Sequence, residues 1–287
     1  MESPHDQVGP DDLRRLSATR FGPPTWVART GSTNADVLDA ARDGAAEGLV
    51  VVADEQTAGR GRRDRVWSAA PGSSLLVSVL LRPPAPLAAL GTAALALSAR
   101  DAVGAVADVE VGLKWPNDLV VSGAAVGDPS GPDRKLAGVL AEADWPASAN
   151  VSVGWRDPAP GDRVVVVAGL GLNVAWQELP PELEGQAVAL NQLRPVITAA
   201  DRAPLLVELL VALEARYARL LAQGPAPLLD EWRRACVTLG REVRVDLGAD
   251  DVVGTAVDLD DGGRLVVETV EGGRRVVAVG DVIHVSR

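Results

Sequence analysis

The C-terminal part of the chain changes character near Gly240 in a way that restricts its fold. From there on, short segments alternate apolar with polar residues and are joined by Gly/Asp turns, as in "REVRVDL", "GGRLVVETV" and "RRVVAVGDVIHV". A period of two predicts strands with one buried face. About five such strands in under fifty residues are typical of a small closed β-barrel of SH3-like size. We therefore expect a separate C-terminal domain over residues 239–287.

The sequence before this domain mixes strands with helices. "LVVVA", "SSLLVSVLL" and "RVVVVAGLGLNV" predict buried strands, and leucines at helical spacing predict a long amphipathic helix over residues 201–223. "STNADVLDAARDG" predicts a helix that Ser32 or Thr33 caps and Gly44 ends. We expect an α+β domain over residues 30–238, preceded by a short, partly mobile leader over residues 1–29.

Composition restricts the classes of function. The 287 residues carry a formal net charge of −11, which disfavours a general nucleic-acid or membrane-surface binder because phosphate surfaces attract clustered cations. No stretch approaches the roughly 18 uninterrupted apolar residues of a membrane span, and the N-terminus lacks the order of a signal peptide. Cys236 is the only cysteine, which fits a reducing cytosol. We expect a soluble, cytoplasmic protein with no nucleic-acid or membrane partner.

Histidine chemistry is not expected at the active site. The two histidines, His5 and His284, both lie near the chain ends. A His-based zinc site or a Ser-His-Asp triad is therefore improbable.

Positive charge is concentrated in one flexible segment of this acidic chain. "ADEQTAGRGRRDRVW" covers residues 53–67, and we call residues 58–66 the arginine loop. Gly59 and Gly61 let the backbone approach a ligand closely, and guanidinium groups can form bidentate hydrogen bonds with a carboxylate or a phosphate. The segment is neither a Walker A motif nor a G-x-G-x-x-G fingerprint. It predicts either a small-anion site or, on composition alone, a solvated surface loop.

A second polar segment, "KWPNDLVV", begins where a predicted strand ends. Lys114 and Asp118 flank a Trp-Pro-Asn turn. Asn117 and Asp118 would suit a magnesium ion that is held mainly by nucleotide phosphates, because Mg²⁺ commonly uses only one or two protein oxygens. A tight turn with a surface ion pair is the competing interpretation.

Three weaker signals accompany these segments. Lys135 precedes the strand "KLAGVL", in which Gly138 leaves room for a close neighbour, and "GLGLN" ends a buried strand at Asn173. Trp67 is either core filler or a stacking surface for adenine. Taken together, the segments predict a site that neutralises several negative charges without a nucleophile or general base. This pattern suits catalysis by positioning and charge stabilisation, and we expect carboxylate adenylation.

These segments, in this order, resemble the biotin protein ligase family. The resemblance rests on "GSTNAD", "ADEQTAGRGRRDRVW", "LKWPNDLVV", "KLAGVLAE" and "AGLGLNV", followed by the small C-terminal barrel. It extends from about Arg29 to the C-terminus and is strongest to the short actinobacterial biotin–acetyl-CoA-carboxylase ligases, which have no N-terminal DNA-binding domain. It implies an α+β fold with a mixed-sheet catalytic domain of the biotin/lipoate ligase type and an SH3-like barrel.

The resemblance also implies a two-step reaction. Biotin's carboxylate attacks the α-phosphate of Mg-ATP to give biotinyl-5′-AMP, and a lysine of a biotin carboxyl carrier domain then displaces AMP. The implied catalytic residues are Lys135, Arg62 and Asp118, with Asp118 also binding the metal. The implied biotin-binding residues are Ser32, Thr33, Asn34, Gln56, Gly59, Arg60, Gly61, Arg62, Lys135 and Gly138. The implied ATP-binding residues are Arg62, Arg63, Trp67, Lys114, Asn117, Asp118, Lys135 and Asn173.

Two alternatives remain open at this point. A lipoate protein ligase shares the fold and the adenylate chemistry, although "GRGRR" and "KWPND" together follow the biotin pattern. A non-enzymatic biotin- or nucleotide-binding regulator would be expected to lose a catalytic position, whereas Arg62, Asp118 and Lys135 are all present. The sequence does not predict the oligomeric state, the natural acceptor, the affinities or the role of the long loops at residues 122–134 and 144–162.

Overall fold

A computed structural model describes residues 8–63, 65–145, 150–151, 154–155, 159, 161–178, 181–248, 251–278 and 280–284. Before residue 240 the helices are α1 (Pro10–Ser17), α2 (Thr33–Arg42), α3 (Gly91–Ala107), α4 (Leu190–Leu193), α5 (Arg202–Gln223) and α6 (Ala226–Ala235). The strands there are β1 (Thr25–Thr30), β2 (Val50–Gln56), β3 (Ser74–Leu81), β4 (Gly112–Lys114), β5 (Asp118–Val121), β6 (Arg134–Asp144), β7 (Asn150–Val151), β8 (Gly154–Trp155) and β9 (Val165–Asn173). Short 3₁₀ helices cover Ala85–Leu90, Gly123–Val126, Pro181–Leu183 and Ala199–Asp201.

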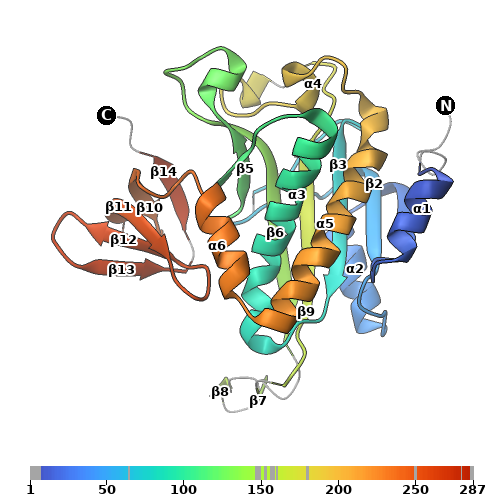
Figure 1. The fold of residues 1–287 in the computed structure, drawn as a ribbon, viewed down its shortest axis with the longest axis horizontal. Helices are drawn as coiled ribbons and strands as arrows, with labels where there is room; N and C mark the ends of the chain where they lie inside the picture. The colour runs from blue at the N-terminus through green and yellow to red at the C-terminus, as the bar shows by residue number, and fades with distance from the viewer. Residues whose placement is uncertain are drawn as a thin grey trace.

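A seven-stranded mixed sheet forms the centre of the larger domain, in the order β1-β2-β3-β9-β6-β5-β4. β1 and β2 run parallel, and the other neighbours run antiparallel. Helices α3 and α5 lie side by side over one face of the sheet, as Figure 1 shows. The expectation of a mixed-sheet α+β fold is confirmed.

Helix α2 packs on the opposite face, and the strand sequences assign the two faces by alternation. On β9, Val166, Ala168 and Leu170 belong to the main core with α3 and α5, whereas Val167 packs with α2. Gly169 and Gly171 follow Val167 at a period of two, so they face the α2 side as well. The α2 side of β6 and β9 therefore carries glycine where the other side carries apolar side chains.

The expected leader over residues 1–29 is wrong for its described residues. Helix α1 and strand β1 belong to the domain: Leu16 and Phe21 are buried, and β1 is an edge strand paired with β2. Arg20 adds ion pairs to Glu214 and Glu47. Hydrophobic periodicity does not predict the burial of Leu16 and Phe21, because they are single apolar residues spaced irregularly between prolines, glycines and charged residues.

The C-terminal domain is a five-stranded antiparallel sheet. Its strands are β10 (Glu242–Asp246), β11 (Asp251–Leu259), β12 (Leu265–Thr269), β13 (Arg274–Val277) and β14 (Asp281–His284), paired in the order β13-β12-β11-β10-β14. Alternate residues such as Val243, Val245, Leu265 and Val267 are fully buried, as the alternating sequence predicts. The domain lies beside α6 (Figure 1), and Trp115, in the turn between β4 and β5, donates its ring N–H to the Gly263 carbonyl at 3.0 Å.

One apolar segment, Ala85–Ala107, is long and apolar enough by composition to cross a membrane. Most of its α3 portion is buried between the sheet and α5. Its hydrophobicity is explained by this place in the core.

Candidate active site

A cavity of about 680 Å³ opens on the α2 side of the sheet, which is within the usual size range of ligand sites. Its walls come from the start of α2, the arginine loop, the β4–β5 turn, strands β6 and β9, and the C-terminal domain. Of the sixteen residues expected to form the site, fourteen line this cavity: Ser32, Thr33, Asn34, Gln56, Arg60, Gly61, Arg62, Trp67, Lys114, Asn117, Asp118, Lys135, Gly138 and Asn173.

The other two, Gly59 and Arg63, lie outside the cavity lining. A Cβ on Gly59 would sit 2.3 Å from the carbonyl oxygen of Trp67, so the glycine serves the close pairing of the two loop ends. Arg63 turns toward the C-terminal domain, where its Nη1 lies 3.3 Å from the Asp246 carbonyl oxygen and 3.4 Å from Asp281 Oδ2. A contact between domains, which no local pattern encodes, determines where Arg63 lies.

A buried polar network forms the wall at the start of α2. Gln56 Oε1 accepts from the backbone N–H of Thr33 at 2.8 Å and lies 3.1 Å from its hydroxyl. Ser78 Oγ lies 2.7 Å from Thr33 Oγ1 and donates to Asn34 Oδ1 at 2.6 Å. Ser32 occupies the N-cap position but makes no side-chain capping bond. Thus Gln56, from a neighbouring strand, accepts from a buried N–H at the start of α2 that has no partner within the helix, and it fixes the polar wall at the same time.

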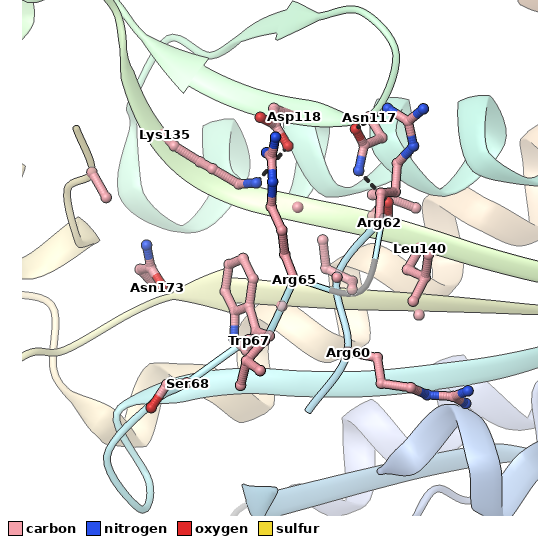
Figure 2. Close-up of a pocket in the computed structure, with 18 of the residues that line it drawn as sticks. Arg60, Arg62, Arg65, Trp67, Ser68, Asn117, Asp118, Lys135, Leu140 and Asn173 are labelled. Atoms are coloured by element: carbon pink, nitrogen blue, oxygen red, sulfur yellow. Dashed lines mark hydrogen bonds and ion pairs between the residues drawn. The ribbon is translucent and has the colours of Figure 1, made fainter. Parts of the chain in front are cut away.

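The β4–β5 turn and the start of β6 bring the basic and acidic groups together. Lys135 Nζ lies 2.6 Å from Asp118 Oδ1, as Figure 2 shows, and 5.6 Å from the centre of the Trp67 ring. Asn117 Nδ2 donates to the Val139 carbonyl at 2.7 Å, which fixes the turn against β6. Burial lowers the pKa of the Lys114 ammonium below its ordinary value, opposed in part by Asp118. Two lysines and one carboxylate therefore share one wall.

Three of the four arginines in the loop are paired with carboxylates. Arg60 contacts Glu142 on β6, while Arg63 and Arg65 contact Asp281 at the start of β14. The loop closes on itself through the N–H of Trp67, which donates to the Gly59 carbonyl, and the N–H of Gly61, which donates to the Arg65 carbonyl.

Arg62 is the exception among the described residues. Its Nη1 lies 3.3 Å from both Asn117 Oδ1 (Figure 2) and the Gly280 carbonyl, and no carboxylate oxygen of the described chain lies within 4 Å. Burial lowers the pKa of its guanidinium, although arginine stays charged in proteins. Arg62 is thus a partly buried cation without a carboxylate partner, which is the arrangement that an anionic ligand would complete.

Trp67 lies on a floor made of paired glycines. Gly138 on β6 and Gly171 on β9 are direct partners in the sheet, and the Trp67 ring rests against both. A Cβ on Gly171 would lie 2.5 Å from Cε2 of the ring. The "GLGLN" segment, which is weak evidence in the sequence, therefore has a specific role: its glycines leave space for Trp67 and, at Gly169, for Asn34.

Sequence reasoning missed the contribution of the C-terminal domain and of Ser78. The cavity is also lined by Asp246, Asp281, Val282 and Ile283. Ser78 could have been found, because it is a single hydroxyl within the otherwise apolar run "LLVSVLL" and is fully buried. Nothing in the local sequence marks Asp281, since an aspartate after glycine is an ordinary turn residue.

Comparisons with known proteins agree with this geometry. The Biotin/lipoate A/B protein ligase family matches residues 26–155, and the Biotin protein ligase C terminal domain matches residues 238–285. A biotin–acetyl-CoA-carboxylase ligase of Mycobacterium tuberculosis is 40% identical over 267 residues, covering 90% of this chain and 87% of the relative. The chain belongs to the biotin protein ligase family. Members of this family form biotinyl-AMP and transfer biotin to a carrier protein.

Other biotin ligases resemble the chain over most of its length. A ligase of Paracoccus denitrificans is 30% identical, covering 89% of this chain and 98% of the relative. The bifunctional ligase/repressor BirA of Bacillus subtilis is 31% identical, covering 91% and 76%. The biotin protein ligase of Aquifex aeolicus in complex with biotin and ATP superimposes with a TM-score of 0.70 at 25% identity, covering 92% and 98%. These relatives and the C-terminal domain favour a biotin ligase over a lipoate ligase.

The glycine floor gives a test of how this ligase holds Trp67. Gly171→Ala should force the ring from its place, destabilise the protein by about 1–3 kcal/mol through overpacking, and weaken biotin and ATP binding. Thermal melts and ligand titrations measure both effects. Gly104→Ala is the control: Gly104 is exposed on α3 with nothing within 4 Å of its would-be Cβ, so that variant should be slightly more stable. Normal ligand affinity in Gly171→Ala would show that Trp67 does not need this position.

Proposed function

We propose that this cavity activates biotin with ATP and that the chain then transfers biotin to a lysine of a biotin carboxyl carrier domain. The observation that carries the proposal is the meeting of Arg62, Lys135 and Asp118 in one cavity, beside a neutral polar wall. The first two supply positive charge, and the Thr33–Gln56–Ser78 wall supplies directional hydrogen bonds for an uncharged head group. A ligand with a polar ring system at one end and a carboxylate at the other fits both the neutral polar wall and the positively charged part of the cavity.

In the first step the carboxylate of biotin attacks the α-phosphorus of ATP and pyrophosphate leaves. Negative charge builds on the phosphoryl oxygens, and Lys135 and Arg62 are the cations assigned to stabilise it. Asp118 holds the Lys135 ammonium at 2.6 Å, which orients it before the substrates arrive. No group of the described chain needs to act as a nucleophile, because the two substrates react with each other.

In the second step an amine of the carrier lysine attacks the anhydride carbonyl, and AMP leaves as the amide forms. The closed arginine loop and the C-terminal domain shield the anhydride from water until the carrier arrives. The carrier lysine enters from outside the chain, since both lysines of this chain, Lys114 and Lys135, are assigned to the substrates. The acceptor is assigned to the carboxyl carrier domain of acyl-CoA carboxylases.

Magnesium is assigned to Asp118. No group of three or more His, Cys, Asp or Glu side chains that could hold a metal occurs among the described residues. One carboxylate at the cavity wall nevertheless suits Mg²⁺, which keeps most of its coordination for phosphate oxygens and water. When bound with ATP, the ion would neutralise phosphate charge that Lys114 and Lys135 do not reach.

The assay for this proposal uses the purified chain, biotin, ATP, magnesium and a carboxyl carrier domain. Pyrophosphate release should require biotin, and the carrier should gain one biotin on its lysine. Lipoate in place of biotin serves as the control substrate and should give little product. Pyrophosphate release with lipoate alone would contradict the biotin assignment, and no release with either acid would contradict ligase activity altogether.

The two lysines also set a limit on self-labelling. Acylation needs an amine, and guanidinium groups do not supply one, so incubation with biotin and ATP alone leaves only Lys114, Lys135 and the N-terminus as possible targets. We expect little label on the chain, because neither lysine is assigned as a nucleophile. Peptide mass spectrometry after digestion locates the label. Biotin on Lys135 in most molecules would mean that this amine is a nucleophile and not an electrostatic catalyst.

A further inference from the structure

His284, at the end of β14, lies in the interface between the two domains and takes no part in the mechanism proposed above. Its Nδ1 lies 2.9 Å from Arg241 Nη1, and its Nε2 lies 3.2 Å from Thr238 Oγ1. Arg241 also donates to Asp133 Oδ2 of the larger domain at 2.9 Å. The imidazole therefore joins a buried hydroxyl to an ion pair that connects the two domains.

The neighbours of His284 determine which of its nitrogens carries the proton. Burial, together with the charges of Lys114 and Arg241, lowers the pKa of the imidazole to about 4, and Asp133 opposes this shift only in part. The ring is therefore neutral at pH 7. Because arginine offers only donors, Nδ1 accepts from Arg241, and the single ring proton lies on Nε2. His284 is thus a neutral donor directed at the Thr238 hydroxyl.

Thr238 extends this contact to the turn between β4 and β5. Its side chain is fully buried, and its Oγ1 accepts from the backbone N–H of Trp115 at 3.1 Å. On the other side of Lys114, the Leu113 carbonyl accepts from the N–H of Val237 at 2.9 Å. The two peptide groups that flank Lys114 are therefore both bonded to the segment between α6 and β10, which leads into the C-terminal domain.

The Lys114 ammonium has no anionic partner in the described part of the chain. No carboxylate oxygen there lies within 4 Å of its Nζ, because Asp118, its partner across the β4–β5 hairpin, pairs with Lys135 instead. The side chain is half-buried and lines the cavity. A cation in this position is oriented mainly by the backbone that carries it, so the contacts of its two flanking peptide groups determine where the ammonium can reach.

We propose that His284 and Thr238 are positioning residues for ATP, because they fix the peptide group after Lys114 and so hold its ammonium where the triphosphate binds. The inference rests on the proposed function for the identity of the ligand. His284 touches no substrate in this scheme and acts through one hydroxyl and one backbone N–H. The polar wall assigned to biotin is held by other contacts, at the start of α2, so the effect should be confined to the nucleotide.

Leucine in place of His284 keeps a bulky side chain but removes both hydrogen bonds. The KM for ATP should rise by roughly five- to tenfold, while the KM for biotin and the kcat at saturating substrates stay within about twofold of the wild type. The Kd for α,β-methylene ATP, in which the bond that breaks in the reaction is replaced, should rise by the same factor as the KM for ATP. Pyrophosphate release and calorimetry, both with magnesium present, measure these values.

Two amide variants separate the two contacts of His284. Glutamine places an amide nitrogen near the position of Nε2 and can still donate to Thr238, whereas asparagine reaches only the position of Nδ1 and can still accept from Arg241. His284→Gln should bind α,β-methylene ATP nearly as tightly as the wild type, and His284→Asn should bind it as weakly as His284→Leu. Thr238→Ser should likewise keep the affinity that Thr238→Val loses.

Lys114 should be the residue through which His284 acts. In a Lys114→Ala background, His284→Leu should raise the KM for ATP by less than about twofold, because the ammonium that it positions is already absent. Asp258→Asn is the control for a weakened contact between the domains. Asp258 Oδ1 pairs with Arg233 Nε of α6 at 2.7 Å, and neither side chain has a hydrogen bond to the β4–β5 turn among the described residues. This variant should bind the analogue like the wild type.

The outcomes separate this inference from the proposed function. A wild-type chain that binds the analogue but releases no pyrophosphate refutes the function, while the comparison of Kd values still tests His284. Equal affinity in His284→Gln and His284→Asn would overturn the inference, and so would an equal rise in the KM for biotin. Additive effects of His284→Leu and Lys114→Ala would overturn it as well. If a thermal melt shows that His284→Leu does not fold, the two amide variants carry the test.

Discussion

Replacing Lys135 with alanine should lower the rate of adenylate formation by several hundredfold or more while leaving the fold intact. Lys135 Nζ lies in the cavity, 2.6 Å from Asp118 Oδ1 and above the Trp67 ring. A single preorganised charge at a developing oxyanion is typically worth about 3–4 kcal/mol, and its loss affects the transition state more than the bound substrates. Pyrophosphate release under saturating biotin and ATP measures the effect, so kcat should fall more than the KM values rise.

The controls for Lys135→Ala follow from its neighbours. A thermal melt separates catalysis from stability, since the removed ion pair is partly exposed and worth about 1 kcal/mol or less. Lys114→Ala removes the only other lysine, which lines the nucleotide side of the proposed site, and should raise the KM for ATP more than it lowers kcat. Near-normal turnover in Lys135→Ala would refute the assignment, and a collapsed melt would show that the lysine is structural.

The sequence predicted elements and residues whose signals are local. Helix α2, the long helix α5 and the strands β3 and β9 follow directly from hydrophobic periodicity, because each buries a face that its own residues define. The cavity residues Thr33, Gln56 and Lys135 lie in short polar segments, but the resemblance to biotin ligases, and not their local chemistry alone, implied that they belong to the site.

The features that escaped prediction depend on contacts between distant segments. Trp26 and Phe21 carry no pattern of their own and become core residues only when β1 joins the sheet beside β2. Arg63 looks equivalent to Arg62 in "GRGRRDR", and only the position of β14 separates them. The sequence shows four arginines close together in the loop, but it does not reveal the carboxylates that pair with three of them. Such pairings depend on the tertiary structure, because the packing of the two domains determines them.

Replacing Arg62 with alanine should have the second large effect on adenylate formation, and the same replacement at its neighbour Arg63 provides an internal control. Arg62→Ala removes the one loop guanidinium that has no carboxylate within 4 Å among the described residues, so its charge is available to the substrates. We expect kcat/KM for adenylate formation to fall by roughly a hundredfold or more, as for other residues that stabilise developing charge. Arg62→Lys should recover part of this loss, because it restores the charge but not the planar fork that binds two oxygens.

Arg63→Ala should cost less than about tenfold, since Arg63 is directed toward Asp246 and Asp281 and contributes mainly through the loop's attachment to the C-terminal domain. The two variants change the same charge at adjacent positions, so they have the same effect on net charge and on long-range attraction of ATP. Any difference in activity between the two variants therefore reflects where each side chain points, because the Arg62 guanidinium faces the reacting groups and the Arg63 guanidinium faces β14. Pyrophosphate release over a range of ATP concentrations measures both variants. Equal losses in kcat/KM would mean that the loop acts through its overall charge. The position of Arg62 in the cavity would then have no special part in catalysis.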